Sequence, residues 1–194
     1  MKASATIAVA AMFAGAAWTA TKLDSQTVLV CIDDRGYTSV ADAAPRASVL
    51  FRSAGVKLQW HSDVNFCQGK RDAIVVSLST NTPKTFLPGA LAYALPYEGV
   101  HIEVFYDRIA LADPDLVPFL MAHVMVHEIT HILQGTDQHS TRGVMKAHWN
   151  SYDYILMKTG RLTFTEPDVE MIHIRSVARA ARISTGTVVR AVAQ

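Results

Sequence analysis

A group of polar residues inside an apolar segment is the part of this sequence most able to do chemistry. Residues 121–145 read MAHVMVHEITHILQGTDQHSTRGVM and contain the pattern H-E-x-x-H at His127, Glu128 and His131. On a helix, His127 and His131 lie one turn apart on the same face, so their ring nitrogens can converge on one cation. Glu128 is displaced by about 100° from that face, close enough to hold a water on the metal without binding the metal. This spacing is typical of zinc-dependent hydrolysis.

A zinc ion used in catalysis usually has three protein ligands and one open position, so a third ligand is expected. Asp137 and His139 are the two candidates. Both follow Gly135, the residue best able to adopt the left-handed conformation that turns the chain back under the helix. We favour His139, because imidazole is the commoner zinc ligand, and Asp137 is the alternative.

These residues resemble the metzincin clan of zinc metalloproteases and small exported bacterial zincins of that type. The clan's pattern is H-E-x-x-H-x-x-G-x-x-H, followed by a methionine turn. Its counterparts here are His127, Glu128, His131, Gly135, His139 with Ser140, and Met145. The spacing departs from the pattern, because Gly135 comes one residue late and His139 two residues late. Asp137 stands where the clan's third ligand would fall, and some metzincins use Asp there.

The resemblance covers residues 123 to 146 and implies an α/β (α+β) fold of the metzincin type. Such a fold has a twisted mixed sheet of about five strands, a backing helix, an active-site helix and a C-terminal helical subdomain. Met145 would form an apolar floor beneath the metal. An extended substrate would lie antiparallel to the strand around His101–Phe105, and the segment from Met145 to Trp149 would wall the pocket beside the cleaved bond.

Hydrophobic periodicity predicts the elements that must position these residues. We expect strands at 27–32, 56–60, 73–78, 91–95 and 100–106, and helices at 39–54, 113–135, 152–158 and from 165 onward. A strand, a helix and a strand in that order predict a right-handed parallel crossover. Alternation of apolar and polar residues in 100–106 indicates one buried face and a candidate sheet edge.

Helix ends are predicted from their capping residues. Ser39 with Asp42 and Thr165 with Asp168 match capping boxes, and Asp113 is expected to cap the central helix. Pro45 lies inside the first predicted helix, where proline removes a hydrogen bond, so that helix is expected to start later or to be kinked.

The first twenty residues predict export. Lys2 precedes an alanine-rich apolar run at 5–17 that ends in small residues, the pattern of a cleaved signal peptide at 1–20. The run is shorter than the roughly 20 residues of a spanning helix, so no stable membrane insertion is expected after cleavage. A single domain at 21–194 would then be secreted or periplasmic. In that oxidising setting Cys31 and Cys67 favour a disulfide over one buried and one free cysteine.

Composition limits the partners. A chain of 194 residues with 50% hydrophobic and 18% charged residues can bury one core. Its net charge of +1 suggests neither nucleic acid nor an anionic membrane as a partner, and it leaves the oligomeric state open. The expected partner is a peptide or protein substrate.

The remaining histidines and two tyrosines are expected to be structural. His123 lies one turn before His127 and could pair with it, but no acid follows His123 as Glu128 follows His127. The other histidines, expected on the surface or in the core, are His61, His101, His148 and His173. Tyr152 and Tyr154 are expected in the core rather than at an oxyanion.

The sequence therefore predicts a zinc-dependent metalloendopeptidase with Zn²⁺ on His127, His131 and His139. Glu128 would take a proton from the attacking water and pass it to the leaving amine. The alternatives are a non-catalytic exported protein that binds zinc or peptide on the same fold, and a zinc amidase that cleaves a non-peptide amide. Glu128 argues against the first, because a closed structural site needs a fourth protein ligand and no adjacent carboxylate.

Overall fold

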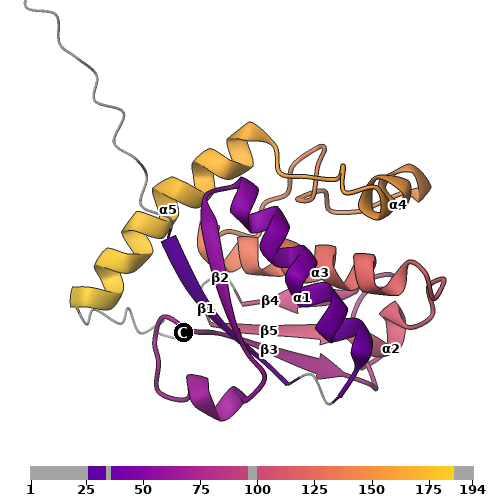
Figure 1. Ribbon diagram of the computed structural model, residues 1–194, viewed down its shortest axis with the longest axis horizontal. Helices are drawn as coiled ribbons and strands as arrows, with labels where there is room; N and C mark the ends of the chain where they lie inside the picture. The colour runs from indigo at the N-terminus through magenta and orange to yellow at the C-terminus, as the bar shows by residue number, and fades with distance from the viewer. Residues whose placement is uncertain (1–25, 34–35, 96–99, 186–194) are drawn as a thin grey trace, which may run out of the picture.

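One five-stranded sheet organises the protein, which is seen here as a computed structural model that describes residues 26–33, 36–95 and 100–185. The strand order is β2-β1-β3-β5-β4 (Figure 1). The strands are β1 (Gln26–Ile32), β2 (Val56–His61), β3 (Ile74–Ser79), β4 (Ala92–Ala94) and β5 (His101–Phe105). All neighbouring strands are parallel except β4, which runs antiparallel to β5. The predicted mixed α/β architecture is confirmed.

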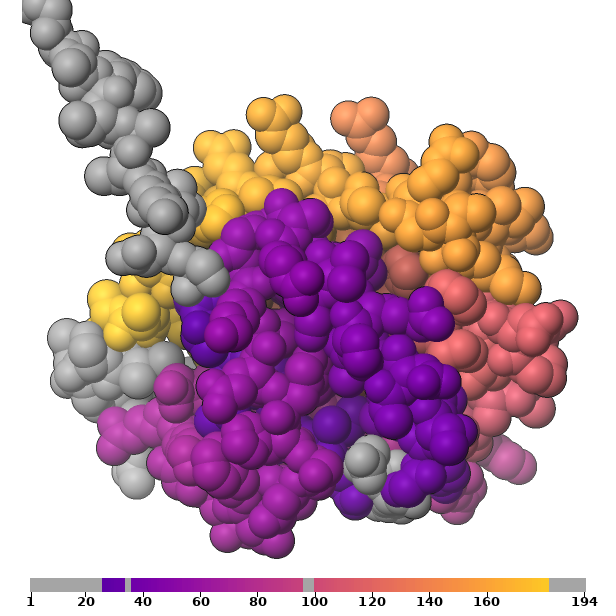
Figure 2. All heavy atoms as spheres, viewed as in Figure 1, coloured from indigo at the N-terminus to yellow at the C-terminus, as the bar shows by residue number. Residues whose placement is uncertain are grey.

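The sheet and two helices enclose the main core. The helices are α1 (Thr38–Ser53), α2 (Tyr106–Ile109), α3 (Val117–Gln134), α4 (Ser151–Lys158) and α5 (Glu166–Thr185), with a short 3-10 helix η1 (Val64–Cys67). In the main core α1 and α3 pack against each other and against apolar side chains of the sheet. Figure 2 shows α1 on the front of the molecule, with the C-terminal elements along the upper rim.

The other face of β1 carries a smaller apolar cluster closed by a disulfide. Alternation along β1 sends Val28 and Val30 into the main core and Leu29 and Cys31 toward η1. Cys31 is bonded to Cys67, which lies 36 residues later in the chain. The predicted bridge is confirmed, and it fastens η1 to the sheet.

Helix α3 is buried on every side along most of its length. All residues from 120 to 134 are buried, because the sheet, α1, α4 and α5 surround the helix. Gly135 ends it at φ +62, as predicted from its freedom to adopt that conformation. The predicted start at Asp113 is wrong. Asp113 instead closes a turn by accepting hydrogen bonds from the amides of Asp115 and Leu116, and the helix begins at Val117.

One predicted capping box is wrong and the other is confirmed. The Ser39–Asp42 capping box does not form, because the Ser39 hydroxyl bonds to the Tyr106 hydroxyl at 3.0 Å and α1 has no side-chain cap. Pro45 lies inside α1 without ending it. The capping box of α5 is confirmed, since the Thr165 amide donates to the Asp168 carboxylate at 2.9 Å.

The predicted edge of the sheet is also wrong. β5 pairs with β3 on one side and with β4 on the other, so the edge strands of the sheet are β4 and, at the other end, β2. The alternation in β5 reflects one face toward the core and one face toward the Phe86–Tyr93 aromatic pair, whose rings pack near Phe105.

Among the described residues, no helix combines the length and the apolar character needed to cross a membrane. The predicted signal peptide at 1–20 and the domain boundary at 21 lie outside the described residues.

Candidate metal centre

Three histidines meet where α3 ends. His127 and His131 come from α3 and His139 from the loop after Gly135, and one ligand nitrogen from each lies within 4.8 Å of the others. The Nε2 atoms of His127 and His131 are 3.0 Å apart. The His139 ring centroid lies 5.1 Å from that of His127 and 4.9 Å from that of His131. The structure therefore brings together the three residues predicted as metal ligands.

Backbone carbonyls decide which nitrogen of each helix histidine can bind a cation. Nδ1 of His127 lies 2.9 Å from the carbonyl oxygen of Val144, and Nδ1 of His131 lies 2.8 Å from that of Thr136. A carbonyl oxygen only accepts, so each Nδ1 carries the hydrogen and each Nε2 keeps its lone pair. Carbonyl partners of this kind are typical of histidines that bind metals.

The two lone pairs face each other, and that arrangement fits a zinc ion. At 3.0 Å, two acceptor nitrogens repel each other unless a cation lies between them. Two nitrogens bound at about 2.0–2.1 Å to a tetrahedral zinc lie about 3.4 Å apart, close to the spacing observed here. His139 is exposed on its loop and supplies a third nitrogen from the same side.

Burial keeps these histidines neutral, which is the form that binds metal. It is the largest cause that lowers the pKa of His127, to about 3, and the neighbouring His131 lowers it further. Burial also lowers the pKa of His131 and of His139. Near neutral pH the three rings therefore offer lone pairs without first losing protons.

Glu128 follows His127 on α3 and is buried. Its side chain is 8% exposed, and burial raises the pKa of its carboxyl group to about 8. Among the described residues none bonds to that carboxyl, so it is free to accept a proton from a ligand. A bound cation nearby would lower its pKa again.

Asp137 lies outside the histidine cluster. Its side chain is exposed, and its charge is close enough to raise the pKa of His131 and of His139 against the opposing effect of burial. The geometry thus favours His139 over Asp137 as the third ligand. Asp137 is placed to act on the site through its charge.

The turn at 143–145 holds the carbonyl that orients His127. The Ser140 amide donates to the Met145 carbonyl at 2.8 Å, and the Val144 amide donates to the Thr163 carbonyl at 3.0 Å. Gly143 has φ +76, and a Cβ atom there would lie 2.7 Å from the Thr163 oxygen, so only glycine fits. Met145 is fully buried in the core.

Asp168 is a residue of the site that the sequence pattern showed only as a helix cap. Its buried carboxylate accepts hydrogen bonds from Ser140 Oγ at 2.5 Å and from Thr165, and its carbonyl accepts one from Gln134 Nε2 at 3.1 Å. It thereby joins the end of α3, the loop of His139 and the start of α5. No local pattern links Ser140 to a residue 28 positions later.

Trp149 and His148 also approach the cluster. The Trp149 ring stands edge-on to His127, with centroids 5.6 Å apart and an interplanar angle of 85°. Its indole Nε1 is buried and has no hydrogen-bond partner among the described residues. His148 is close enough to His139 to lower its pKa, although burial is the larger cause. The segment after the methionine turn therefore borders the site.

The other residues considered from the sequence lie apart from the cluster. His123 is buried, with Nδ1 2.7 Å from the carbonyl oxygen of Phe119 and Nε2 3.2 Å from that of Leu162. Its neutral ring donates to one of these carbonyls, so it acts as a structural link. Tyr154 is half-buried against the core. The expectation that Tyr152 is a core residue is wrong, because its side chain is 62% exposed.

The fold is similar to that of a known metzincin-type protein. Archaemetzincin from Methanopyrus kandleri has a crystal structure that matches this chain with a TM-score of 0.50 at 15% sequence identity. The match covers 80% of this chain and 98% of archaemetzincin. No protein-family model and no curated protein matches the sequence. At this identity the likeness shows the fold, which is the metzincin-like α/β architecture predicted from the sequence.

Proposed function

We propose that this protein is a zinc-dependent metalloendopeptidase with His127, His131 and His139 as the zinc ligands. The observation that carries the proposal is the pair of Nε2 lone pairs, 3.0 Å apart, on two histidines whose Nδ1 atoms are held by backbone carbonyls. The resemblance of the motif to metzincins and the likeness of the fold to archaemetzincin support it.

Glu128 is the residue proposed to move protons. A zinc ion held by His127, His131 and His139 would act as a Lewis acid, which would make water nucleophilic near neutral pH and favour negative charge on the scissile carbonyl oxygen. The carboxylate of Glu128 accepts the proton of the attacking water and delivers it to the leaving amine. Since Glu128 follows His127 directly on α3, its carboxyl is positioned by the same helix that holds two ligands.

The edge strand β4 is the proposed place for an extended substrate, in place of the interior strand β5. β4 packs against α3, so a peptide that pairs with its outer edge would pass near the histidines. Arg108 supports that edge, because its Nη1 donates to the carbonyls of Leu87 at 2.8 Å and Ala90 at 2.7 Å just before β4.

Export to an oxidising compartment is part of the proposal. The Cys31–Cys67 disulfide supports it, because such bonds persist in secreted and periplasmic proteins and are rare in the cytosol.

The test compares Glu128→Gln with Glu170→Gln, a control at an exposed position on α5. Both variants and the parent are loaded with one equivalent of zinc and incubated with a mixture of denatured proteins, with and without a chelator. We expect chelator-sensitive cleavage by the parent and by Glu170→Gln. In Glu128→Gln the rate should fall by about 100-fold or more, the usual contribution of a general base.

Zinc content, measured on the same samples by mass spectrometry, separates loss of chemistry from loss of metal. Glu128→Gln should retain its zinc, because the carboxylate is not a ligand. Cleavage by Glu128→Gln at the parent rate would refute its role as the base. A zinc-loaded parent that cleaves no protein in the mixture would favour the exported binding protein or the amidase.

A further inference from the structure

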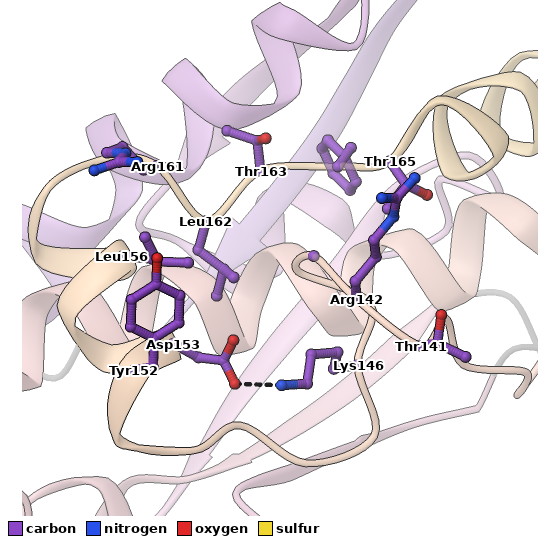
Figure 3. Close-up of a pocket in the computed structure, with 12 residues that line it drawn as sticks. Thr141, Arg142, Lys146, Tyr152, Asp153, Leu156, Arg161, Leu162, Thr163 and Thr165 are labelled. Atoms are coloured by element: carbon purple, nitrogen blue, oxygen red, sulfur yellow. Dashed lines mark hydrogen bonds and ion pairs between the residues drawn. The ribbon is translucent and has the colours of Figure 1, made fainter.

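A second pocket lies behind the methionine turn, separate from the histidine cluster. It has a volume of about 440 Å³ and is formed by the loop 141–146, by α4 and by the segment 161–165 (Figure 3). None of the three histidines lines it. Val144 stands between the two sites, since its carbonyl bonds to His127 and its amide bonds to Thr163 in the pocket wall. The volume lies in the range of small-molecule sites, about 300–1,000 Å³.

The lining of this pocket carries more positive than negative charge. Arg142, Lys146 and Arg161 are cationic, and Asp153 is the one carboxylate in the lining. Asp153 is already engaged, because it accepts from Lys146 Nζ at 2.5 Å and from the Asn150 amide at 2.8 Å. Within the described part of the chain, no acidic group pairs with Arg142 or Arg161. This local excess stands out in a protein whose net charge is only +1.

The pocket also has uncharged hydrogen-bond donors, and hydrogen bonds hold its walls in place. Figure 3 shows Arg142 on one side and Tyr152 on the other, with the Lys146–Asp153 ion pair between them and Leu162 pointing in from above. Thr141 and Thr163, whose side chains carry hydroxyl groups, belong to the same lining. The α4 capping box at Asn150 fixes one wall. The Arg161 and Leu162 amides fix another by donating to the Leu156 carbonyl at 2.8 and 3.2 Å.

We propose that this pocket binds a small anion, a carboxylate or a phosphate group, with Arg142 as its main ligand. The planar guanidinium matches such groups with two parallel hydrogen bonds, and the nearby hydroxyls supply further donors. The anion comes either from a free phosphate-bearing molecule or from an acidic side chain of a peptide. The proposal does not depend on peptidase activity.

Titration calorimetry on the full chain at constant ionic strength tests it, with inorganic phosphate and a capped aspartate amide as the probes. Constant ionic strength is needed because screening alone weakens contacts between exposed charges. We expect saturable binding of at least one probe. Arg142→Gln should weaken it about tenfold or more, the effect of losing a charge-assisted hydrogen-bond pair. Arg175→Gln, an exposed position on α5 outside the lining, should bind like the parent.

Each outcome decides the proposal. Binding of phosphate alone identifies a phosphate-bearing ligand, and binding of the capped aspartate identifies an acidic side chain. Arg161→Gln serves as a second variant, and circular dichroism shows whether each variant is folded. The proposal is overturned if neither probe saturates, or if folded Arg142→Gln and Arg161→Gln both bind like the parent.

Discussion

The two helix histidines owe their orientation to main-chain atoms. Val144 and Thr136 supply the carbonyl oxygens that hold Nδ1 of His127 and of His131. No side-chain substitution at those two positions removes these acceptors. The orientation of the two rings therefore depends on the turns that carry these carbonyls, and Gly135 and Gly143 shape those turns.

The third ligand can be identified from zinc affinity. His139→Ala should weaken zinc binding by at least about 100-fold, since a ligand counts for more than the 10–100-fold typical of an outer hydrogen-bond partner. Asp137→Ala should keep one zinc per chain, because the carboxylate lies outside the cluster. Competition against a chelating dye measures both. Retained affinity in His139→Ala together with loss in Asp137→Ala would reverse the assignment.

The segment 161–165, called the strap below, contacts three parts of the site: α3, the methionine turn and α5. Its Leu162 carbonyl meets His123 of α3, and its Thr163 carbonyl accepts from Val144 in the methionine turn. The strap then leads into α5 through the Thr165–Asp168 capping box. Movement of this segment would therefore displace the carbonyl that orients His127.

Gly143 tests that connection, with Gly89 as its matched control. Both have positive φ, +76 and +86, but an added Cβ meets the Thr163 oxygen at 2.7 Å only at Gly143, whereas nothing lies within 4 Å at Gly89. Gly89→Ala should cost about 1 kcal/mol of unfolding free energy from backbone strain. Gly143→Ala should cost about 2–4 kcal/mol because overpacking adds to that strain, and it should also weaken zinc binding. Equal denaturant midpoints for the two variants would contradict this.

For the whole molecule, the disulfide and the metal centre are independent supports. The bond between Cys31 and Cys67 closes 36 residues of sequence on the η1 side of β1, away from the main core that contains α3. Replacing both cysteines by alanine should lower the unfolding free energy by about 2–4 kcal/mol, mainly by freeing the unfolded chain. Zinc stoichiometry should not change. Denaturant titration and metal analysis measure the two effects, and a loss of zinc in the folded variant would show coupling.

The stability of the metal-free protein should fall on acidification. Burial lowers the pKa of His123, His127 and His131 in the folded protein, while the unfolded chain titrates near the ordinary value of about 6.5. Below that pH the unfolded state binds more protons at these three histidines, and they outnumber the one extra proton that buried Glu128, with its pKa of about 8, holds in the folded state. The unfolding free energy therefore decreases on balance as the pH falls below about 6.5. Denaturant midpoints between pH 7.5 and 5 measure the loss.

His123→Gln measures the contribution of His123 to the pH dependence of the unfolding free energy, without changing a proposed metal ligand. Glutamine takes up no proton in this range, so the variant should lose less stability than the parent between the same pH values. An unchanged slope would show that His123 is not buried in its neutral form.

Much of the architecture follows from local patterns. The H-E-x-x-H spacing, the glycine that ends α3 and the alternation of the strands are dictated by neighbours a few residues apart, and such features are readable along the chain. For that reason all five strand positions, the α5 capping box and the meeting of His127 with His131 agree with expectation. The start of α3 and the cap of α1 disagree, because Asp113 and Ser39 found other partners in the fold.

Contacts between segments far apart in the sequence could be seen only in the folded structure. Packing among residues far apart in sequence determined three features. These are the position of β4 at an edge of the sheet, the choice of His139 as the residue that joins the two helix histidines, and the hydrogen bond between Asp168 and Ser140. A local pattern carries no information on such encounters, because they depend on how whole elements fill the space around the buried α3. Residue types and spacing thus predicted the metal ligands and the neighbouring acid. The residues that surround and orient them were determined by long-range packing.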